Sequence, residues 1–342
     1  MAGLAHRCIK RFIARTASKA RFIGVMPTRW LAVVSPTSAS FVVSLSVVLA
    51  AGAGCAAHAA EVKPLASREA KQVFGEIELP SSAPQRSIGK YDRGCIAGAK
   101  SLPVTGQSWQ AMRLSRNRIW GHSSLVKYIE KLARDSKKLD GWPGLLVGDM
   151  GQPMGGPMLS GHASHQLGLD ADLWFKPMPD RVLTPTEREE AAADSVVDET
   201  ALTVDKTLWT EAQAKLLKRA ASYSEVARIF VHPAIKKALC NFAGKDRTWL
   251  QKIRPWWKHN DHFHVRLNCP SGDSVCVAQP PTGTEDGCGK ELDDWIKRLR
   301  VPPAPAPKPS PPPKPVLMSD MPKECQDMAA AQEKLIAAKA AP

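Results

Sequence analysis

Several common catalytic signatures are missing from this sequence of 342 residues. No two cysteines have the Cys-x-x-Cys spacing of a thiolate zinc site, and no His-Glu-x-x-His motif occurs. Ser160 and Ser164 lack the Gly-x-Ser-x-Gly context of a hydrolase nucleophile. These absences argue against a zinc finger, a peptidase of the His-Glu-x-x-His type and a serine hydrolase.

Acidic residues are absent from the first 59 residues, which contribute half of the formal net charge of +14. The remainder is only modestly basic, so the charge gives little reason to expect a nucleic-acid partner. A basic stretch up to Arg29, an apolar stretch at 41–53 and Ala57-His58-Ala59 together predict an export signal over 1–59, cleaved before Ala60. The apolar run is shorter than the ~20 residues of a membrane span. We therefore expect an exported protein with no stable span after cleavage, with an uncleaved anchor or a lipoprotein attached at Cys55 as the alternatives.

Cysteine usage agrees with export. Six cysteines follow the export segment: Cys95, Cys240, Cys269, Cys276, Cys288 and Cys325. An even number in an exported chain predicts three disulfides. The residues alone leave the pairing open, although the short spacing between Cys269 and Cys276 is compatible with a local loop.

The hydrophobic pattern predicts one α+β catalytic domain over residues 85–300. Residues 60–84 are expected to form an extended lead-in, and the proline-rich 301–342 a C-terminal tail. Helices are predicted at 123–139 and 210–222, strands at 145–147, 227–231 and 262–267, and a surface excursion at 176–206.

Histidine is concentrated in two short stretches, 160–173 and 259–267. In the first, Leu167, Leu169, Ala171 and Leu173 alternate with Gly168, Asp170 and Asp172, and in the second, Phe263, Val265 and Leu267 alternate with His262, His264 and Arg266. Alternate residues of a strand share a face, so both patterns predict strands with an apolar face on the core and a polar face on a cleft.

Catalytic zinc takes three protein ligands of His or carboxylate type plus a water. His165, Asp172 and His264 supply this set, and Asp149 and Asp170 are available to accept hydrogen bonds from the ligating rings. The alternative is a His/Asp network without metal. Asp149 and Trp257 are also candidates for substrate contact, although the Trp256-Trp257 pair is equally compatible with a core position.

At these residues the sequence resembles the penicillin-insensitive murein endopeptidases. They belong to a group of zinc peptidases that includes lysostaphin-type enzymes, D-Ala-D-Ala peptidases and the sonic hedgehog signalling domain. The group shares His-x6-Asp followed by a distant His-x-His, here His165…Asp172 and His262-x-His264. The closer likeness runs from Ser87 to Trp295 and includes SIGKYDRGCIAGA, GDMGQPMGG, SGHASHQLGLDADLW, ARIFVHPAIKKALC and KIRPWWKHNDHFHVRLNCP.

The resemblance implies a small antiparallel β-sheet that carries a zinc site and is flanked by helices and long loops. It implies a periplasmic endopeptidase that cuts the D-alanyl–meso-diaminopimelate crosslink of peptidoglycan and, having no nucleophilic serine, is insensitive to penicillin. The implied zinc ligands are His165, Asp172 and His264, with His162 at or beside the metal. His259 and His262 match the remaining active-site histidines, and we expect His259 to act as the base, with His262 as the second choice.

The same resemblance implies three disulfides, Cys95–Cys325, Cys240–Cys288 and Cys269–Cys276. Some relatives carry an Asp-x-x-His in the excursion, proposed as a second metal site. This chain has no histidine between His165 and His232, so we expect one zinc per chain. A murein carboxypeptidase, an L,D-endopeptidase or a non-catalytic murein-binding protein are the alternatives, and the sequence leaves the oligomeric state open.

Overall fold

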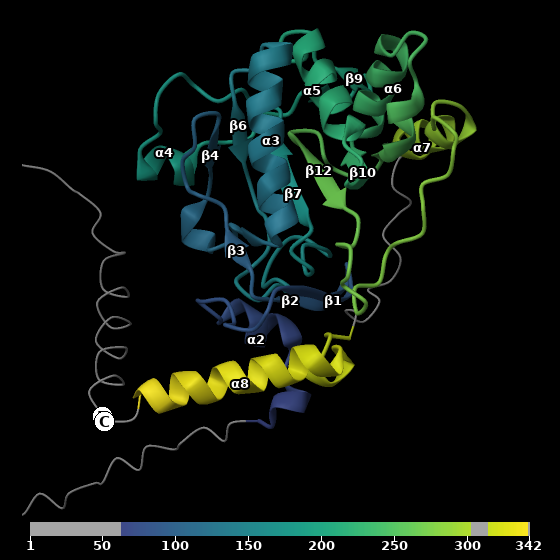
Figure 1. Cartoon of the computed structure of the whole chain (residues 1–342). Helices are drawn as coiled ribbons and strands as arrows, with labels where there is room; N and C mark the ends of the chain where they lie inside the picture. The colour runs from purple at the N-terminus through teal and green to yellow at the C-terminus, as the bar shows by residue number, and fades with distance from the viewer. Residues whose placement is uncertain (1–62, 302–313, 341–342) are drawn as a thin grey trace, which may run out of the picture. The chain divides into compact units, whose positions relative to one another are not determined.

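The computed structural model describes residues 63–301 and 314–340, whose elements are drawn in Figure 1. The predicted export segment 1–59, its cleavage site, Cys55 and most of the proline-rich tract lie outside the described residues. Within the described ranges, no helix has both the length and the apolar character needed to cross a membrane. Residues Lys63–Ala337 form one compact unit.

Helices and short strands alternate along this unit. The helices are α2 (Ala70–Gly75), α3 (Ser123–Asp140), α4 (Pro185–Glu190), α5 (Glu211–Ser222), α6 (Pro233–Phe242), α7 (Lys290–Arg300) and α8 (Lys323–Ala340). The strands are β1 (Arg86–Lys90), β2 (Arg93–Ala97), β3 (Lys100–Ser101), β4 (Trp109–Ala111), β5 (Trp120–Gly121), β6 (Leu145–Val147), β7 (Asp170–Trp174), β8 (Val197–Asp198), β9 (Thr203–Val204), β10 (Val226–Val231), β11 (Ile253–Pro255) and β12 (His262–Leu267). Four 3₁₀ turns complete the described elements: η1 (Leu65–Ser67), η2 (Leu114–Arg116), η3 (Thr248–Lys252) and η4 (Met318–Asp320).

The main sheet has six strands in the order β11-β10-β12-β7-β6-β4. Its central neighbours are antiparallel, but β10 with β11 and β4 with β6 are parallel. The prediction of an antiparallel sheet is therefore wrong for the outer pairs, and the sheet is mixed. The physical reason is that parallel neighbours need a crossover connection. Helix α3 lies in the connection from β4 to β6, and helix α6 lies in the connection from β10 to β11, so each of these helices belongs to a crossover between parallel strands.

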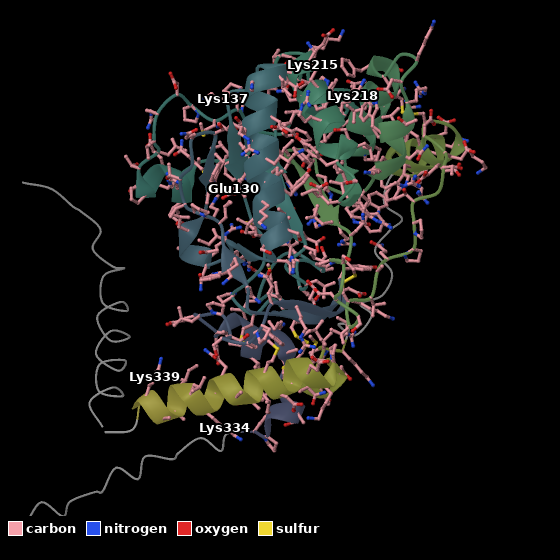
Figure 2. All side chains as sticks on the ribbon, viewed as in Figure 1. Glu130, Lys137, Lys215, Lys218, Lys334 and Lys339 are labelled. Carbon is pink, nitrogen blue, oxygen red and sulfur yellow. A yellow bond between two sulfur atoms is a disulfide. The ribbon has the colours of Figure 1, made fainter. Side chains whose placement is uncertain are left out.

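The core lies between this sheet and the helices packed on it, with α3 running along the sheet in Figure 1. Leu125, Ile129 and Leu132 of α3 are fully buried there, whereas Lys137 of α3 and Lys215 of α5 lie on the outer surface (Figure 2). The apolar faces of β7 and β12 join the same core, as the alternation of the two strands predicts.

A second, smaller core joins the two ends of the described chain. Val73 and Phe74 of α2 pack there with Met318 and Ala329, around the disulfide between Cys95 and Cys325. Segment 60–84 thus contains a helix where an extended lead-in was expected, and the tail contributes α8 to the folded unit (Figure 1). Two further disulfides are Cys240–Cys288 and Cys269–Cys276, so all three pairs match those that the resemblance implies.

Candidate metal centre and adjoining pocket

Two antiparallel strands bring the polar side chains of the candidate centre together. In the register of β7 and β12, Asp172 lies opposite His264 and Asp170 lies opposite Arg266. His165 comes from the loop before β7 and adopts a left-handed backbone with φ of 65°, which is uncommon for a residue with a Cβ. The residues Val265 and Ala171, on the opposite face, are fully buried and hold the register from behind.

Three histidine rings surround the carboxylate of Asp172. His165 Nε2 lies 3.4 Å and His264 Nδ1 3.2 Å from Asp172 Oδ1, and these two nitrogens are 3.2 Å apart. His162 Nδ1 lies 3.4 Å from Asp172 Oδ2. Candidate ligand atoms of His162, His165 and Asp172 all lie within 4.8 Å of one another. The structure therefore brings together the four side chains that the sequence predicts at the metal.

In each of the rings of His162, His165 and His264, the nitrogen that points away from Asp172 faces a hydrogen-bond acceptor. His165 Nδ1 is 3.1 Å from the carbonyl oxygen of Met150, and His264 Nε2 is 2.6 Å from Asp170 Oδ1. His162 Nε2 is 3.0 Å from Asp149 Oδ2. Because carbonyl and carboxylate oxygens only accept, each outward nitrogen carries a hydrogen and donates it. In a neutral imidazole the inward nitrogen then keeps its lone pair, the arrangement found in metal-ligating histidines.

The centre consequently consists of acceptors that face one another. Asp172 Oδ1 is buried and receives no hydrogen bond from any group that the structure describes. Buried lone pairs and a carboxylate this close are unfavourable unless a cation lies between them. Imidazole nitrogens with one carboxylate are a donor set typical of catalytic zinc, so these residues fit the metal that the sequence predicts.

Electrostatics keep the two aspartates of β7 ionised. Burial acts to raise the pKa of Asp172, but the neighbouring imidazoles, first those of His165 and His262, outweigh it and hold the pKa well below its usual range. Burial likewise opposes ionisation of Asp170, and Arg266 together with His264 outweighs it, so this pKa is also low. Both carboxylates are negative at neutral pH and favour a cation in their midst.

His259 and His262 lie beside this cluster. His259 Nδ1 donates to the carbonyl oxygen of Trp257 at 2.7 Å, which leaves Nε2 as the accepting nitrogen. Burial lowers the pKa of His259 to about 3, with His262 and His264 adding to the effect. His259 and the preceding Lys258 both have left-handed backbones, with φ of 58° and 60°. Such strain is maintained only where surrounding contacts impose it, often at functional sites.

His262 has the opposite electrostatic setting. Its Nδ1 contacts Asp261, and its Nε2 lies 3.6 Å from Asp172 Oδ1. Burial acts to lower the pKa of His262, but the two carboxylates outweigh it and raise the pKa above its ordinary value. The two histidines therefore differ in charge preference although they are close neighbours, with ring centroids 5.0 Å apart.

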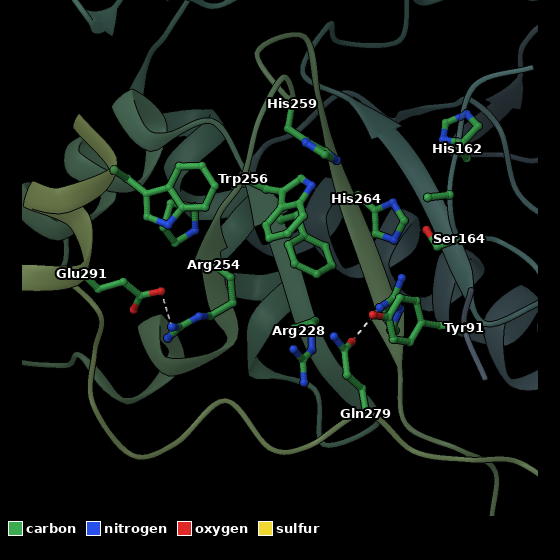
Figure 3. Close-up of a pocket in the computed structure, with 15 residues that line it drawn as sticks. Tyr91, His162, Ser164, Arg228, Arg254, Trp256, His259, His264, Gln279 and Glu291 are labelled. Carbon is green, nitrogen blue, oxygen red and sulfur yellow. Dashed lines mark hydrogen bonds and ion pairs between the residues drawn. The ribbon is translucent and has the colours of Figure 1, made fainter. Parts of the chain in front are cut away.

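A pocket of about 370 Å³ opens beside the centre and is lined partly by His162, His259 and His264. Figure 3 shows His264 between His259 and His162, with Trp256 just below His259. Trp256 lines the pocket, while its neighbour Trp257 packs at 4.9 Å on Trp295 and is not among the lining residues. Both tryptophans are roughly half exposed, so neither has the core position that was the alternative.

Asp149 is buried, and its carboxylate accepts hydrogen bonds from three side chains of the protein. Its Oδ2 accepts from Arg118 at 2.8 Å, from Arg116 at 3.0 Å and from His162 at 3.0 Å. Burial acts to raise the pKa of Asp149, but the bonds from His162 and Arg118 outweigh it and lower the pKa to about 2. This geometry favours the role of orienting His162 over direct contact with a substrate.

Comparison with known proteins matches the model of the penicillin-insensitive murein endopeptidase family to residues 87–330. The penicillin-insensitive murein endopeptidase of Haemophilus influenzae is 47% identical over 220 residues, which cover 64% of this chain and 76% of the relative. Those of Pectobacterium atrosepticum and Escherichia coli strain K12 are 43% and 42% identical, covering 67% and 65% of this chain and 80% of each relative. The chain belongs to the penicillin-insensitive murein endopeptidase family.

The resemblance identified from the histidine motifs is thus confirmed. The family match continues beyond residue 300, into the segment predicted to be a tail, and ends within α8. This endopeptidase has one feature that the motif analysis missed, a group of arginines in the pocket that includes Arg228 and Arg254. The signal was present, because Arg228 and Phe230 alternate with the buried Ile229 and Val231 of β10.

Proposed function

We propose that this murein endopeptidase holds one zinc ion with His165, Asp172 and His264, with His162 beside them. We further propose that it hydrolyses the D-alanyl–meso-diaminopimelate crosslink of peptidoglycan in the periplasm. The observation that carries the proposal is the set of inward lone pairs around the unpartnered Asp172 Oδ1. This set lies at the wall of a pocket in a member of a murein endopeptidase family.

The protein's contribution at the metal is orientation. Bound zinc supplies a Lewis acid that lowers the pKa of a water and polarises a carbonyl. Asp170 fixes the tautomer of His264, the carbonyl of Met150 that of His165, and Asp149 that of His162. Each of these acceptors also makes its ring a stronger donor of electron density.

We assign the proton transfers to His259. The hydrogen bond from its Nδ1 to the Trp257 carbonyl leaves Nε2 free to accept a proton. A base placed at the pocket takes a proton from the attacking water and returns it to the leaving amine. The left-handed backbone at Lys258 and His259 supports a position held for function.

His262 complements this base. The carboxylates of Asp172 and Asp261 flank its ring and raise its pKa above the ordinary value. An N–H donor at this place can stabilise negative charge that develops on the substrate oxygen. Three disulfides in the folded unit support an oxidising compartment such as the periplasm.

The test is digestion of purified, crosslinked murein by the oxidised protein, with and without chelator and with zinc added back. We expect crosslinked dimers to become monomers only with zinc, with cleavage at the diaminopimelate amine read from product masses. His165→Ala should abolish zinc binding and cleavage, whereas His122→Ala, which removes a helix-capping histidine outside the cluster, should retain both. Release of terminal D-alanine alone would point to a carboxypeptidase, and bound but uncut murein to a binding protein.

A further inference from the structure

The pocket beside the metal centre carries an excess of positive charge. Arg228, Arg254 and Arg266 line it, and Glu291 is the carboxylate among its lining residues (Figure 3). Guanidinium groups stay charged at any physiological pH. An arginine of this group that no carboxylate of the protein neutralises would be free to bind an anionic group of the substrate.

Two of the three arginines have partners within the protein. Arg254 forms an ion pair with Glu291, drawn as a dashed line in Figure 3. Arg266 Nε donates to Asp170 Oδ1 at 2.6 Å, and its Nη1 donates to Gln279 Oε1 at 2.6 Å. The plane of Arg266 also stacks on Tyr91, 4.1 Å from the ring centroid. These two side chains are held in place and their charges are balanced.

Arg228 is different. Its Nη2 donates to the carbonyl oxygen of Pro280, but its Nε is buried and has no acceptor among the described residues. Nor does any carboxylate of the described chain form an ion pair with it. Burial, and then the charges of Arg266 and Arg254, lower its pKa. A half-buried cation beside two others, with an unused donor, is unfavourable until an anion joins it.

The strand register sets where such an anion would lie. On the paired strands β10 and β12, Phe230 lies opposite His264 and Arg228 lies opposite Arg266. Arg228 is thus two residues from Phe230 on the same face, about 7 Å along the strand. An arginine side chain is long enough to span that separation. The guanidinium of Arg228 can therefore reach a group on the substrate residue next to a bond that is cut beside His264.

We propose that Arg228 binds a free carboxylate carried by the substrate residue that supplies the scissile nitrogen. In a D-alanyl–meso-diaminopimelate crosslink, the carbon that bears the scissile nitrogen also bears a free carboxylate. The inference rests on the proposed function, because it takes this crosslink as the substrate. Phe230 and Trp256, which line the same pocket, would cover the aliphatic part of that residue. The planar fork of arginine suits paired hydrogen bonds to a carboxylate.

The experiment compares crosslinked peptide dimers cut by the zinc-loaded full chain. In one dimer the carboxyl group beside the scissile nitrogen is the free acid, and in the second it is a primary amide. A third dimer keeps that acid but has amides in place of the carboxyl groups of the D-alanine-donating stem. We expect the wild type to cut the first dimer with a kcat/KM roughly 10- to 100-fold above the second, as expected for hydrogen bonds to a charged group. The third should be cut like the first.

Arg228→Gln should cut the acid and amide dimers at similar rates, and Arg228→Lys should recover part of the preference. The ratio of the two rates does not depend on how much of a variant is folded. Arg298→Gln serves as the matched control, because Arg298 is an exposed arginine stacked on Trp295 beside the pocket, and it should keep the wild-type ratio.

The outcomes separate the two proposals. If the wild type cuts all the dimers equally well, the carboxylate site is refuted while the endopeptidase function stands. The assignment to Arg228 is overturned, with the endopeptidase function intact, by either of two results. One is that Arg228→Gln still prefers the acid dimer over the amide dimer, and the other is that the third dimer is cut more slowly than the first. If the wild type cuts none of them, the proposed function itself fails, and this inference fails with it.

Discussion

Replacing Asp170 by asparagine tests the argument that protein acceptors hold the candidate ligands in their metal-binding tautomers. Asp170 is fully buried, and its Oδ1 accepts from His264 Nε2 and Arg266 Nε, both at 2.6 Å. Asparagine has nearly the same shape but carries no charge. The substitution therefore weakens the hold on His264 without opening a cavity.

The expected magnitude follows from those two bonds. Loss of an acceptor behind a metal-ligating histidine lowers metal affinity by about 10- to 100-fold, which corresponds to about 1.4–2.7 kcal/mol. The folded state also loses the carboxylate that neutralises buried Arg266. Breaking a buried ion pair costs about 3–5 kcal/mol, and we expect the lower end because Arg266 keeps its bond to Gln279.

Zinc affinity is measured by competition with a chromophoric chelator, and stability by urea unfolding of the metal-free protein. Asp140→Asn is the matched control, since Asp140 pairs with Arg219 between α3 and α5, away from the metal centre. The control should lose some stability and keep its zinc affinity. If Asp170→Asn remains folded and binds zinc as tightly as the wild type, the tautomer argument is wrong.

Three further predictions concern other parts of the molecule. His259→Ala should keep a full complement of zinc and turn over about 10²- to 10⁴-fold more slowly, and an unchanged rate would remove His259 as the base. Cys325→Ser, which breaks the disulfide to Cys95, should lower the free energy of unfolding by about 2–5 kcal/mol and make residues 316–340 the first site of limited proteolysis. Burial lowers the pKa of Lys236 from 10.5 to about 7, so between those values the unfolded chain binds more protons. Stability should therefore rise from pH 7 toward pH 10, by up to about 5 kcal/mol, in the wild type and not in Lys236→Met, as urea titrations at several pH values would show.

The strands that carry the candidate centre were predictable because their side chains alternate. The apolar residues at 167–173 and 262–267 fix which face is buried, and a shift by one residue would expose Phe263 and bury His264 against the core. The same regularity predicted α3 and α5, whose observed bounds differ from the predicted ones by a single residue at one end. The spacing of apolar residues was sufficient to predict an element wherever that element buries one face and exposes the other.

Features that depend on distant residues were not predictable in this way. The apolar residues of α2 are few, and their burial depends on Met318 and Ala329, which arrive from the other end of the chain. The left-handed backbone of His165 was not predictable either, since no glycine or asparagine marks the position. The charge imbalance around Arg228 became visible only when the register placed Arg266 opposite it and Glu291 beside Arg254.

The smaller core shared by α2, β1, β2 and α8 determines the order in which the chain can complete its folding. A chain that crosses a membrane with its N-terminus first presents Val73, Phe74 and Ile88 long before residues 316–329 arrive to cover them. Cys95 likewise cannot form its disulfide until Cys325, 230 residues later in the sequence, is present. In such a chain the smaller core closes only after α8 has emerged, and until then the Cys95 thiol can pair with a cysteine that lies between it and Cys325. For a chain exported in this way, the arrival of residues 316–329 completes the smaller core and allows the disulfide between Cys95 and Cys325 to form.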